Sequence, residues 1–166
     1  MSVGIFGGTF DPVHIGHLRA AEEIREQYTL DKVYFVPAYI PPHKRTRKIT
    51  DPATRLRMLK AAIRGNRFLR ASEIEIKSGG VSYSINTIRM FEKRFEQIYF
   101  IIGIDAFLEI DTWYSYRELF DYADFIIMGR PTNEKKEPKA LFPGDIRKEG
   151  LLSQPLAASP GLKAQP

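Results

Sequence analysis

Two histidines near the amino terminus have the type and spacing of phosphate-binding groups. His14 and His17 are three residues apart, which places them on one face of a helix that starts there. The preceding Gly7 and Gly8 allow the backbone to approach a ligand closely. Free N–H groups at a helix start also favour anionic oxygens. A strand, a glycine turn and a helix start form the layout in which α/β proteins receive phosphate, so we expect a phosphate site here.

The segment matches neither of the two common phosphate loops. It lacks the Lys-Ser or Lys-Thr pair of a Walker loop, and its glycines at 7, 8 and 16 do not fit the dinucleotide fingerprint. No third His, Cys or acidic residue lies at ligand spacing from the histidines, so we expect no metal held by the protein. A purely structural role, with a tight turn and packed histidines, is the alternative to a phosphate site.

Nucleotidyl transfer is the chemistry that fits these residues. Attack on the α-phosphate of a nucleoside triphosphate needs positioning and charge stabilisation more than covalent help from the protein. An imidazole can donate a hydrogen bond to the negative charge that develops on phosphate oxygens. A helix N-terminus disfavours the charged imidazolium, so we expect the histidines to act as neutral donors.

The segment from Gly7 to Leu18 resembles a known family signature. It reads Gly-Gly-Thr-Phe-Asp-Pro-Val-His-Ile-Gly-His-Leu and contains the His-x-Gly-His motif of the nucleotidylyltransferase superfamily. The whole string is similar to the bacterial nicotinate mononucleotide adenylyltransferases. The resemblance implies that His14 and His17 are catalytic and stabilise charge on the reacting phosphate. It also implies substrate contacts by Gly7, Gly8, Thr9 and Phe10.

A basic loop follows the second expected strand. Pro42-His43-Lys44 lies where ligands bind in α/β proteins, and a lysine there can hold phosphate as a compact cation. On the residues alone, a solvated basic loop explains the segment equally well. The family carries a similar Pro-His-Lys loop that reaches the phosphates, which implies a catalytic role for Lys44.

Three further segments, residues 82–87, 103–113 and 130–131, resemble family motifs that frame the pyridine nucleotide. In the first, Ser84 and Asn86 replace the usual Thr and Asp. The substrate contacts that the resemblance implies here are those of Tyr83, Thr87, Gly103, Asp105, Trp113 and Arg130.

Specific roles are implied for Thr87 and Trp113. The resemblance places Thr87 against the nicotinate carboxylate and the indole of Trp113 over the pyridine ring. From the residues alone, the hydroxyls of the first segment can be helix caps, and a lone tryptophan can belong to the core.

Composition limits the class of protein. The chain has 166 residues, 43% hydrophobic and 27% charged, which suits one globular domain. It has no cysteine, so disulfides and thiolate metal sites are excluded. The net charge of +5 raises the question of nucleic acid, but no recognition motif accompanies it. Basic residues concentrate only at residues 44–48, and a nucleotide substrate explains that cluster as well as a polymer would. No apolar run can cross a bilayer and no leader pattern opens the chain, so we expect a cytoplasmic protein.

Strand-like and helix-like stretches alternate along the chain. Strands are predicted at residues 3–6, 32–38, 68–76, 98–103 and 123–128, with helical patterns between them and two short helices over 105–122. This order predicts an α/β fold of the nucleotidylyltransferase type, a Rossmann-like doubly wound parallel sheet of about five strands.

The last part of the chain differs in composition. We expect residues 1–131 to form the nucleotidylyltransferase domain and residues 132–166 an irregular, atypical tail, because prolines are dense there and no period is sustained. The family's Ile-Ser-Ser-Thr-x-Ile-Arg segment, which holds the ATP phosphates, does not occur in this sequence. Loss or replacement of the C-terminal part, for instance by a frameshift, is the hypothesis that this change suggests.

The expected function is adenylyl transfer from ATP to nicotinate mononucleotide. The resemblance implies that this gives nicotinate adenine dinucleotide and pyrophosphate in NAD biosynthesis, with Mg²⁺ carried by ATP. One alternative is a remnant that binds the mononucleotide but handles ATP poorly. The other is pantetheine-phosphate adenylyltransferase, which shares only the His-x-Gly-His core.

Overall fold

A computed structural model describes residues 1–42, 48–129 and 139–141. Its strands form one sheet in the order β3-β2-β1-β4-β5-β6. All neighbouring pairs are parallel except β5 with β6. The strands are β1 Ser2–Gly8, β2 Lys32–Pro37, β3 Leu69–Ala71, β4 Gln97–Gly103, β5 Asp124–Met128 and β6 Lys139–Leu141.

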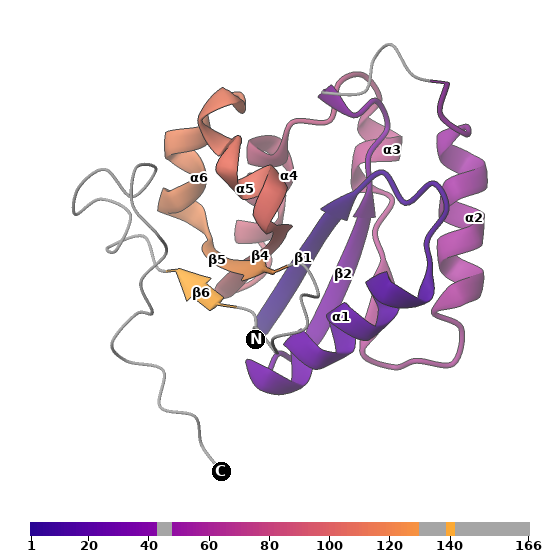
Figure 1. Cartoon of the computed structure of the whole chain (residues 1–166), viewed down its shortest axis with the longest axis horizontal. Helices are drawn as coiled ribbons and strands as arrows, with labels where there is room; N and C mark the ends of the chain where they lie inside the picture. Colours follow the sequence, from indigo (N-terminus) through magenta and orange to yellow (C-terminus); the bar gives the residue numbers. More distant parts are fainter. Residues whose placement is uncertain (43–47, 130–138, 142–166) are drawn as a thin grey trace.

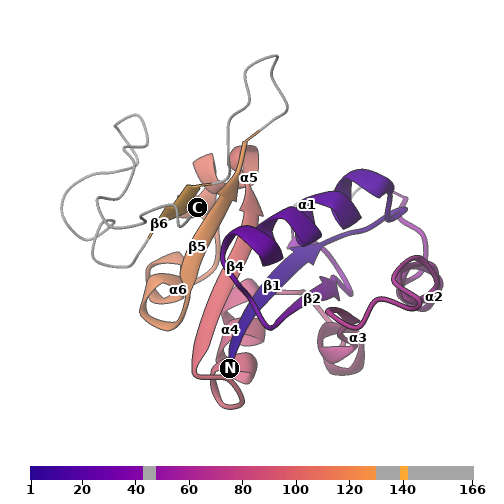
Figure 2. The same cartoon turned by 90° about the horizontal axis from the view of Figure 1, so that it is seen from below.

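Helices cover both faces of this sheet (Figures 1 and 2). Residues of α1 and α2 share one core cluster with one face of the strands, whereas residues of α4, α5 and α6 share the other cluster with the opposite face. The helices are α1 Ile15–Gln27, α2 Pro52–Ala62, α3 Ile74–Ser78, α4 Ser84–Glu92, α5 Ile104–Leu108, the 3₁₀ turn η2 Ile110–Thr112 and α6 Tyr116–Tyr122. The predicted doubly wound α/β fold is therefore confirmed.

Strand β1 shows why the sheet needs two layers of helices. Val3 and Ile5 are buried in the cluster that includes α4, and Phe6 is buried in the cluster that includes α1. Successive side chains of a strand point to opposite faces, so a central strand of this kind must be covered on both sides.

The predicted third strand over residues 68–76 was wrong in its second half. Only Leu69–Ala71 pairs with β2, and the chain then forms helix α3, Ile74–Ser78. The alternation of Ile74 and Ile76 with glutamates is too short to separate a strand from one helical turn. The carboxylate of Glu73 forms ion pairs with Lys77 four residues later and with Lys60 of α2, and these favour the helical turn.

The second half of the chain contains one confirmed expectation and one strand that was not expected. The two short helices predicted over residues 105–122 are confirmed as α5 and α6, with η2 between them. A sixth strand, β6, was not predicted, because three residues within a stretch without clear period give no pattern to detect. None of the described helices is long and apolar enough to cross a membrane.

The strand order locates the ligand-binding edge of the sheet. Strands β1 and β4 are neighbours in the middle, and the chain connections run outward from them in opposite directions. Ligands of open α/β sheets bind at such a switch point, beyond the carboxyl ends of the strands. Here those ends are Gly8 of β1 and Gly103 of β4.

Candidate active site

The turn after β1 is built around the ring of Phe10. Phe10 has a positive φ of 49° and is only 3% exposed, so its side chain points into the core. A Cβ on Gly8 would lie 2.9 Å from the Phe10 ring, whereas a Cβ on Gly7 would meet nothing nearer than 3.6 Å, on Phe100. Gly8 therefore makes room for Phe10, and a substrate contact by Phe10 would have to come from its backbone.

The two histidines lie next to this turn at the start of α1. His14 is the extended residue before the helix, with φ −141° and ψ 170°, and its side chain is exposed. Its ring stacks on that of His17 with centroids 3.7 Å apart. A Cβ on Gly16 would come within 3.1 Å of the His14 ring. Glycine at the third position of His-x-Gly-His therefore gives the His14 ring the space it occupies.

His17 is held as a neutral imidazole with a defined tautomer. Its Nδ1 accepts a hydrogen bond from the backbone N–H of His14 at 3.2 Å, so the proton of the neutral ring is on Nε2. Burial, followed by the charge of His14, lowers the pKa of His17 to about 4. The ring packs edge-on against Phe6 and Phe10, with centroids 6.0 and 5.1 Å away. This agrees with the expected neutral donor, but burial rather than the helix terminus is the main cause.

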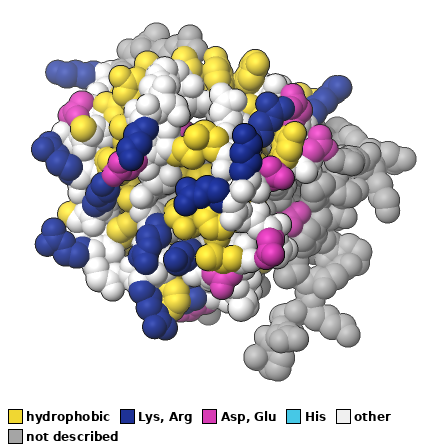
Figure 3. Space-filling model, turned by 180° about the vertical axis from the view of Figure 1, so that it is seen from behind, with side chains coloured by type: hydrophobic (Ala, Val, Ile, Leu, Met, Phe, Trp, Pro, Cys, Tyr) yellow, Lys and Arg dark blue, Asp and Glu magenta, His cyan; other side chains and the backbone are white. Residues whose placement is uncertain are grey.

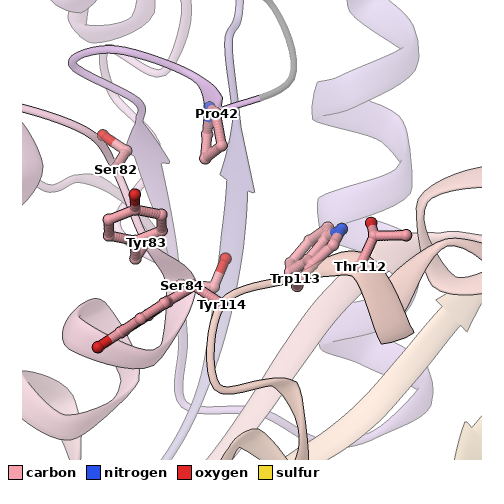
Figure 4. A pocket seen from close by; sticks show the side chains of 7 residues that line it. All are labelled: Pro42, Ser82, Tyr83, Ser84, Thr112, Trp113 and Tyr114. Atoms are coloured by element: carbon pink, nitrogen blue, oxygen red, sulfur yellow. The ribbon is translucent and has the colours of Figure 1, made fainter.

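A cavity of about 370 Å³ lies at the carboxyl edge of the sheet. One side is formed by the start of α4 and the other by the segment after η2, with Tyr83 and Trp113 on the two sides (Figure 4). The rings of Tyr83 and Tyr114 lie 4.7 Å apart, and the half-buried Trp113 packs edge-on against Phe100. The lining residues are Pro42, Ser82, Tyr83, Ser84, Thr112, Trp113 and Tyr114. The structure thus brings the predicted residues Tyr83 and Trp113 to one cavity.

The hydroxyl of Thr87, three residues after Ser84 in α4, is engaged in a hydrogen bond. Thr87 is 3% exposed, and its Oγ1 donates to Oε1 of Glu75 at 2.5 Å. Burial raises the pKa of the Glu75 carboxyl, against the hydrogen bonds from Thr87 and Ser82 that lower it. Ser84, which replaces the usual Thr of the family motif, lines the cavity three residues before Thr87.

The helix that carries Ser84 begins without a side-chain cap. Tyr83 precedes the first helical residue, and its side chain makes no capping hydrogen bond. The first N–H groups of a helix have no partner within the helix, so this terminus favours a negatively charged group. Ser84, the first residue of this helix, lines the cavity, so the start of α4 borders its aromatic walls.

The remaining predicted residues are distributed as follows. Gly103 ends β4 with open space around it, since an added Cβ would meet nothing within 4 Å. Asp105 is exposed in the first turn of α5, and neither residue lines the cavity. Lys44 and Arg130 lie outside the described residues. The catalytic role assigned to Lys44 and the substrate contacts assigned to the other three residues stay predictions.

Arg55 is a buried charged residue near the site that the family motifs do not include. It has no exposed surface and donates to the carbonyl oxygens of Thr9 and Ala38, each at 2.6 Å. The available sequence signal was its place beside Leu56 and Leu59 on the apolar side of a helix, where arginine is rarely buried without partners.

On the face opposite to Figure 1, Lys and Arg side chains are spread among acidic and apolar ones instead of forming one patch (Figure 3). Among residues 1–42, 48–129 and 139–141, no three His, Asp or Glu side chains gather as a metal site.

Comparisons with known proteins place the chain in a family. The model of the cytidylyltransferase-like family matches residues 5–154. A protein of Desulfatibacillum aliphaticivorans is 47% identical over 131 residues, which cover 79% of this chain and 61% of the relative. One of Pelobacter propionicus is 43% identical over 151 residues, which cover 90% of this chain and 70% of the relative. Both relatives bear the name "Probable nicotinate-nucleotide adenylyltransferase".

A solved structure has the same fold. It is the Plasmodium falciparum nicotinic acid mononucleotide adenylyltransferase complexed with NaAD, with a TM-score of 0.68 and 18% identity over 81% of this chain and 67% of that chain. The chain therefore belongs to the cytidylyltransferase-like family, together with the nicotinate-nucleotide adenylyltransferases to which it is similar. It spans 61% and 70% of the length of the two bacterial relatives.

Proposed function

We propose that the chain transfers the adenylyl group of ATP to nicotinate mononucleotide and releases pyrophosphate. The observation that carries this proposal is the aromatic cavity between Tyr83 and Trp113, at the same edge of the sheet as the stacked His14 and His17. The names of the two relatives also support the nicotinate substrate over the pantetheine alternative.

The cavity suits a pyridine ring that bears a carboxylate. A flat aromatic ring can pack against Tyr83 and Trp113. The uncapped start of α4 then offers N–H groups to a carboxylate, assisted by the hydroxyl of Ser84. We therefore assign the carboxylate contact to Ser84 in place of Thr87, whose hydroxyl is bound to Glu75.

The reaction needs no covalent intermediate with the protein. A phosphate oxygen of the mononucleotide attacks the α-phosphorus of ATP, and the bond from that phosphorus to the bridging oxygen breaks. Pyrophosphate leaves with the electron pair, and the attacking dianion has no proton to lose. Nε2–H of His17 and the imidazole of His14 donate to the α-phosphate oxygens as charge develops. The backbone of Gly7, Gly8 and Thr9 places the phosphates. Lys44 contacts the phosphates, as the family resemblance implies.

Mg²⁺ enters this proposal as an ion carried by ATP. The described residues include no cluster of three ligating side chains, so the nucleotide and water would supply most of its ligands. Bound in this way, the ion would neutralise charge on the triphosphate. The proposal also includes the cytoplasmic location expected from the sequence.

The test is pyrophosphate release by the purified protein with ATP and each of three acceptors. We expect release with nicotinate mononucleotide, less with nicotinamide mononucleotide and none with phosphopantetheine. His17→Ala should abolish most of the release, which excludes a contaminating enzyme. Release with phosphopantetheine alone would support the pantetheine alternative. Calorimetric binding of nicotinate mononucleotide without release would instead show a binding remnant, and the proposal would fail.

A further inference from the structure

Arg55 of α2 joins three separate stretches of backbone at the edge of the site. Its Nη1 donates to the carbonyl of Thr9 in the turn after β1, at 2.6 Å. Its Nη2 donates to Ala38 and Tyr39 after β2, at 2.6 and 3.3 Å. Its Nε donates to Thr50, just before α2, at 2.8 Å. One side chain therefore holds the turn after β1, which we call the phosphate turn, against the chain segments on both sides of residues 40–49.

Further hydrogen bonds join the same stretches of backbone, which together we call the junction. The N–H of Thr50 donates to the carboxylate of Asp11 at 2.8 Å, and the N–H of Ala38 donates to the carbonyl of Gly8 at 2.9 Å. Asp11 of the Gly-Gly-Thr-Phe-Asp-Pro segment thus binds the same residue as Arg55. The carboxylate accepts from the N–H of Thr50, and the guanidinium donates to its carbonyl.

The junction continues to the wall of the cavity. The N–H of Tyr39 donates to Oγ of Ser82 at 2.8 Å, and the N–H of Ser82 donates to the carbonyl of Ile40 at 3.0 Å. Ile40 and Val81 also form a parallel β-bridge. Ser82 lines the cavity beside Tyr83. A path of direct hydrogen bonds therefore leads from Thr9, through Arg55 and Tyr39, to the cavity wall.

An arginine is specifically suited to this position. Its planar guanidinium has five N–H donors in a fixed fork, whereas lysine has three donors on a point charge. Burial lowers the pKa of Arg55, and the charges of Asp11 and Asp51 oppose this effect. The fork meets four carbonyl oxygens at once, which a lysine cannot do in the same geometry.

We propose that Arg55 is a positioning residue that fixes the spacing between the phosphate turn at Thr9 and the mononucleotide cavity at Ser82. This inference rests on the proposed function, in which the two substrates occupy these two places. In-line attack requires the acceptor phosphate and the α-phosphorus to be aligned, and an error near 1 Å can cost about 100-fold in rate. Each substrate still has its own contacts without Arg55, so its loss reduces kcat much more than it raises either KM.

The kinetic test compares Arg55→Met, Arg55→Lys and the control Arg57→Met. Arg57 lies on the same helix but is exposed, and it donates to the hydroxyl of Thr54 within that helix. Arg55→Met should lower kcat about 10- to 100-fold, with both KM values within about threefold of the parent. Arg55→Lys should lie between the two, and Arg57→Met should match the parent. An unchanged kcat in folded Arg55→Met, or a loss confined to KM, overturns the proposal.

A second measurement does not depend on activity. The amides of Ala38, Tyr39 and Thr50 donate to Gly8, Ser82 and Asp11, so their hydrogen exchange reports on the junction. Exchange at all three should be faster in Arg55→Met and in Arg55→Lys than in Arg57→Met. Faster exchange confined to α2 shows that Arg55 only supports its own helix, and the proposal then fails. If the parent protein releases no pyrophosphate, the proposed function fails, while the exchange data still decide whether Arg55 holds the junction. Should Arg55→Met not fold, Arg55→Lys carries both measurements.

Discussion

The backbone N–H of His14 donates to Nδ1 of His17, 3.2 Å away, and thereby determines which nitrogen of His17 carries its proton. Protonation of His17 would remove the acceptor of this bond in a site that already disfavours charge. The structure thus presents Nε2–H as a neutral donor while the His14 ring stacks on the same imidazole. The two residues of the motif work as one unit, since one orients the other.

Replacements of His17 should distinguish the roles of its two ring nitrogens. His17→Ala should lower kcat by about 10²–10³, the effect of losing one preorganised donor to a developing charge. His17→Gln places an amide N–H near the position of Nε2 and should recover part of the loss. His17→Asn places its amide near Nδ1 and should resemble alanine. Initial rates of pyrophosphate release measure all three, and equal rates for the Gln and Asn variants would contradict the assigned tautomer.

The stability of the protein should depend on pH through His17. Its pKa is about 4 in the folded protein and 6.5 when unperturbed, so the unfolded chain binds more protons between these values. The free energy of unfolding should therefore decrease as the pH falls from 6.5 to 4, by about 2 kcal/mol for this group given its partial exposure. Urea unfolding of the parent and of His17→Gln at several pH values measures the difference. Parallel curves for the two proteins would show that His17 does not contribute.

The two glycines after β1 should respond differently to an added methyl group. Gly8→Ala puts Cβ 2.9 Å from the Phe10 ring, which packs on His17, so the ring must move. We expect a loss of about 1–3 kcal/mol in the free energy of unfolding and a lower kcat. Gly7→Ala meets only Phe100, at 3.6 Å, and should be close to neutral in stability. Chemical denaturation and kinetics test the pair, and equal losses would show that the Phe10 contact is not decisive.

Trp113 is the only tryptophan, so its fluorescence reports on the cavity. Nicotinate mononucleotide should quench its emission by packing a pyridine ring against it, and a non-hydrolysable ATP analogue alone should quench it less. Trp113→Ala should raise the KM for the mononucleotide about fivefold, since an aromatic contact contributes roughly 1 kcal/mol. Calorimetric binding without any change in emission would place the pyridine ring elsewhere.

Substitutions of Ser84 and Thr87 should affect different properties, substrate binding at Ser84 and stability at Thr87. Ser84→Ala removes a hydroxyl from the cavity and should raise the KM for nicotinate mononucleotide about tenfold, the usual effect of losing a hydrogen bond to a charged group. Thr87→Val removes one of the two hydrogen bonds to the buried Glu75 carboxyl and should lower the free energy of unfolding by about 1–3 kcal/mol, with a smaller change in KM. Kinetics and urea unfolding of both variants separate the effects. A larger KM effect at Thr87 would restore it as the carboxylate contact.

Most of the individual strands and helices were accessible from the sequence because their local patterns were long enough. Buried apolar runs such as the one within Gln97–Gly103 and the helical spacing of Ile85, Ile88 and Phe91 predict their elements directly. At α3 and at β6 the pattern was too short to identify the element. In those places ion pairs and strand pairing with distant residues outweighed local preference.

The sequence by itself predicted most of the strands and helices in their order along the chain, and it placed Tyr83 and Trp113 among the candidate residues. Only the tertiary structure decided which hydroxyl of the first turns of α4 faces the cavity and which donates to Glu75. It alone revealed Arg55, whose partners at Thr9 and Ala38 are 46 and 17 residues away in the chain. Local patterns specify a helix or a strand because neighbouring residues form it, whereas a site depends on distances between segments, and these are set by packing of the whole domain.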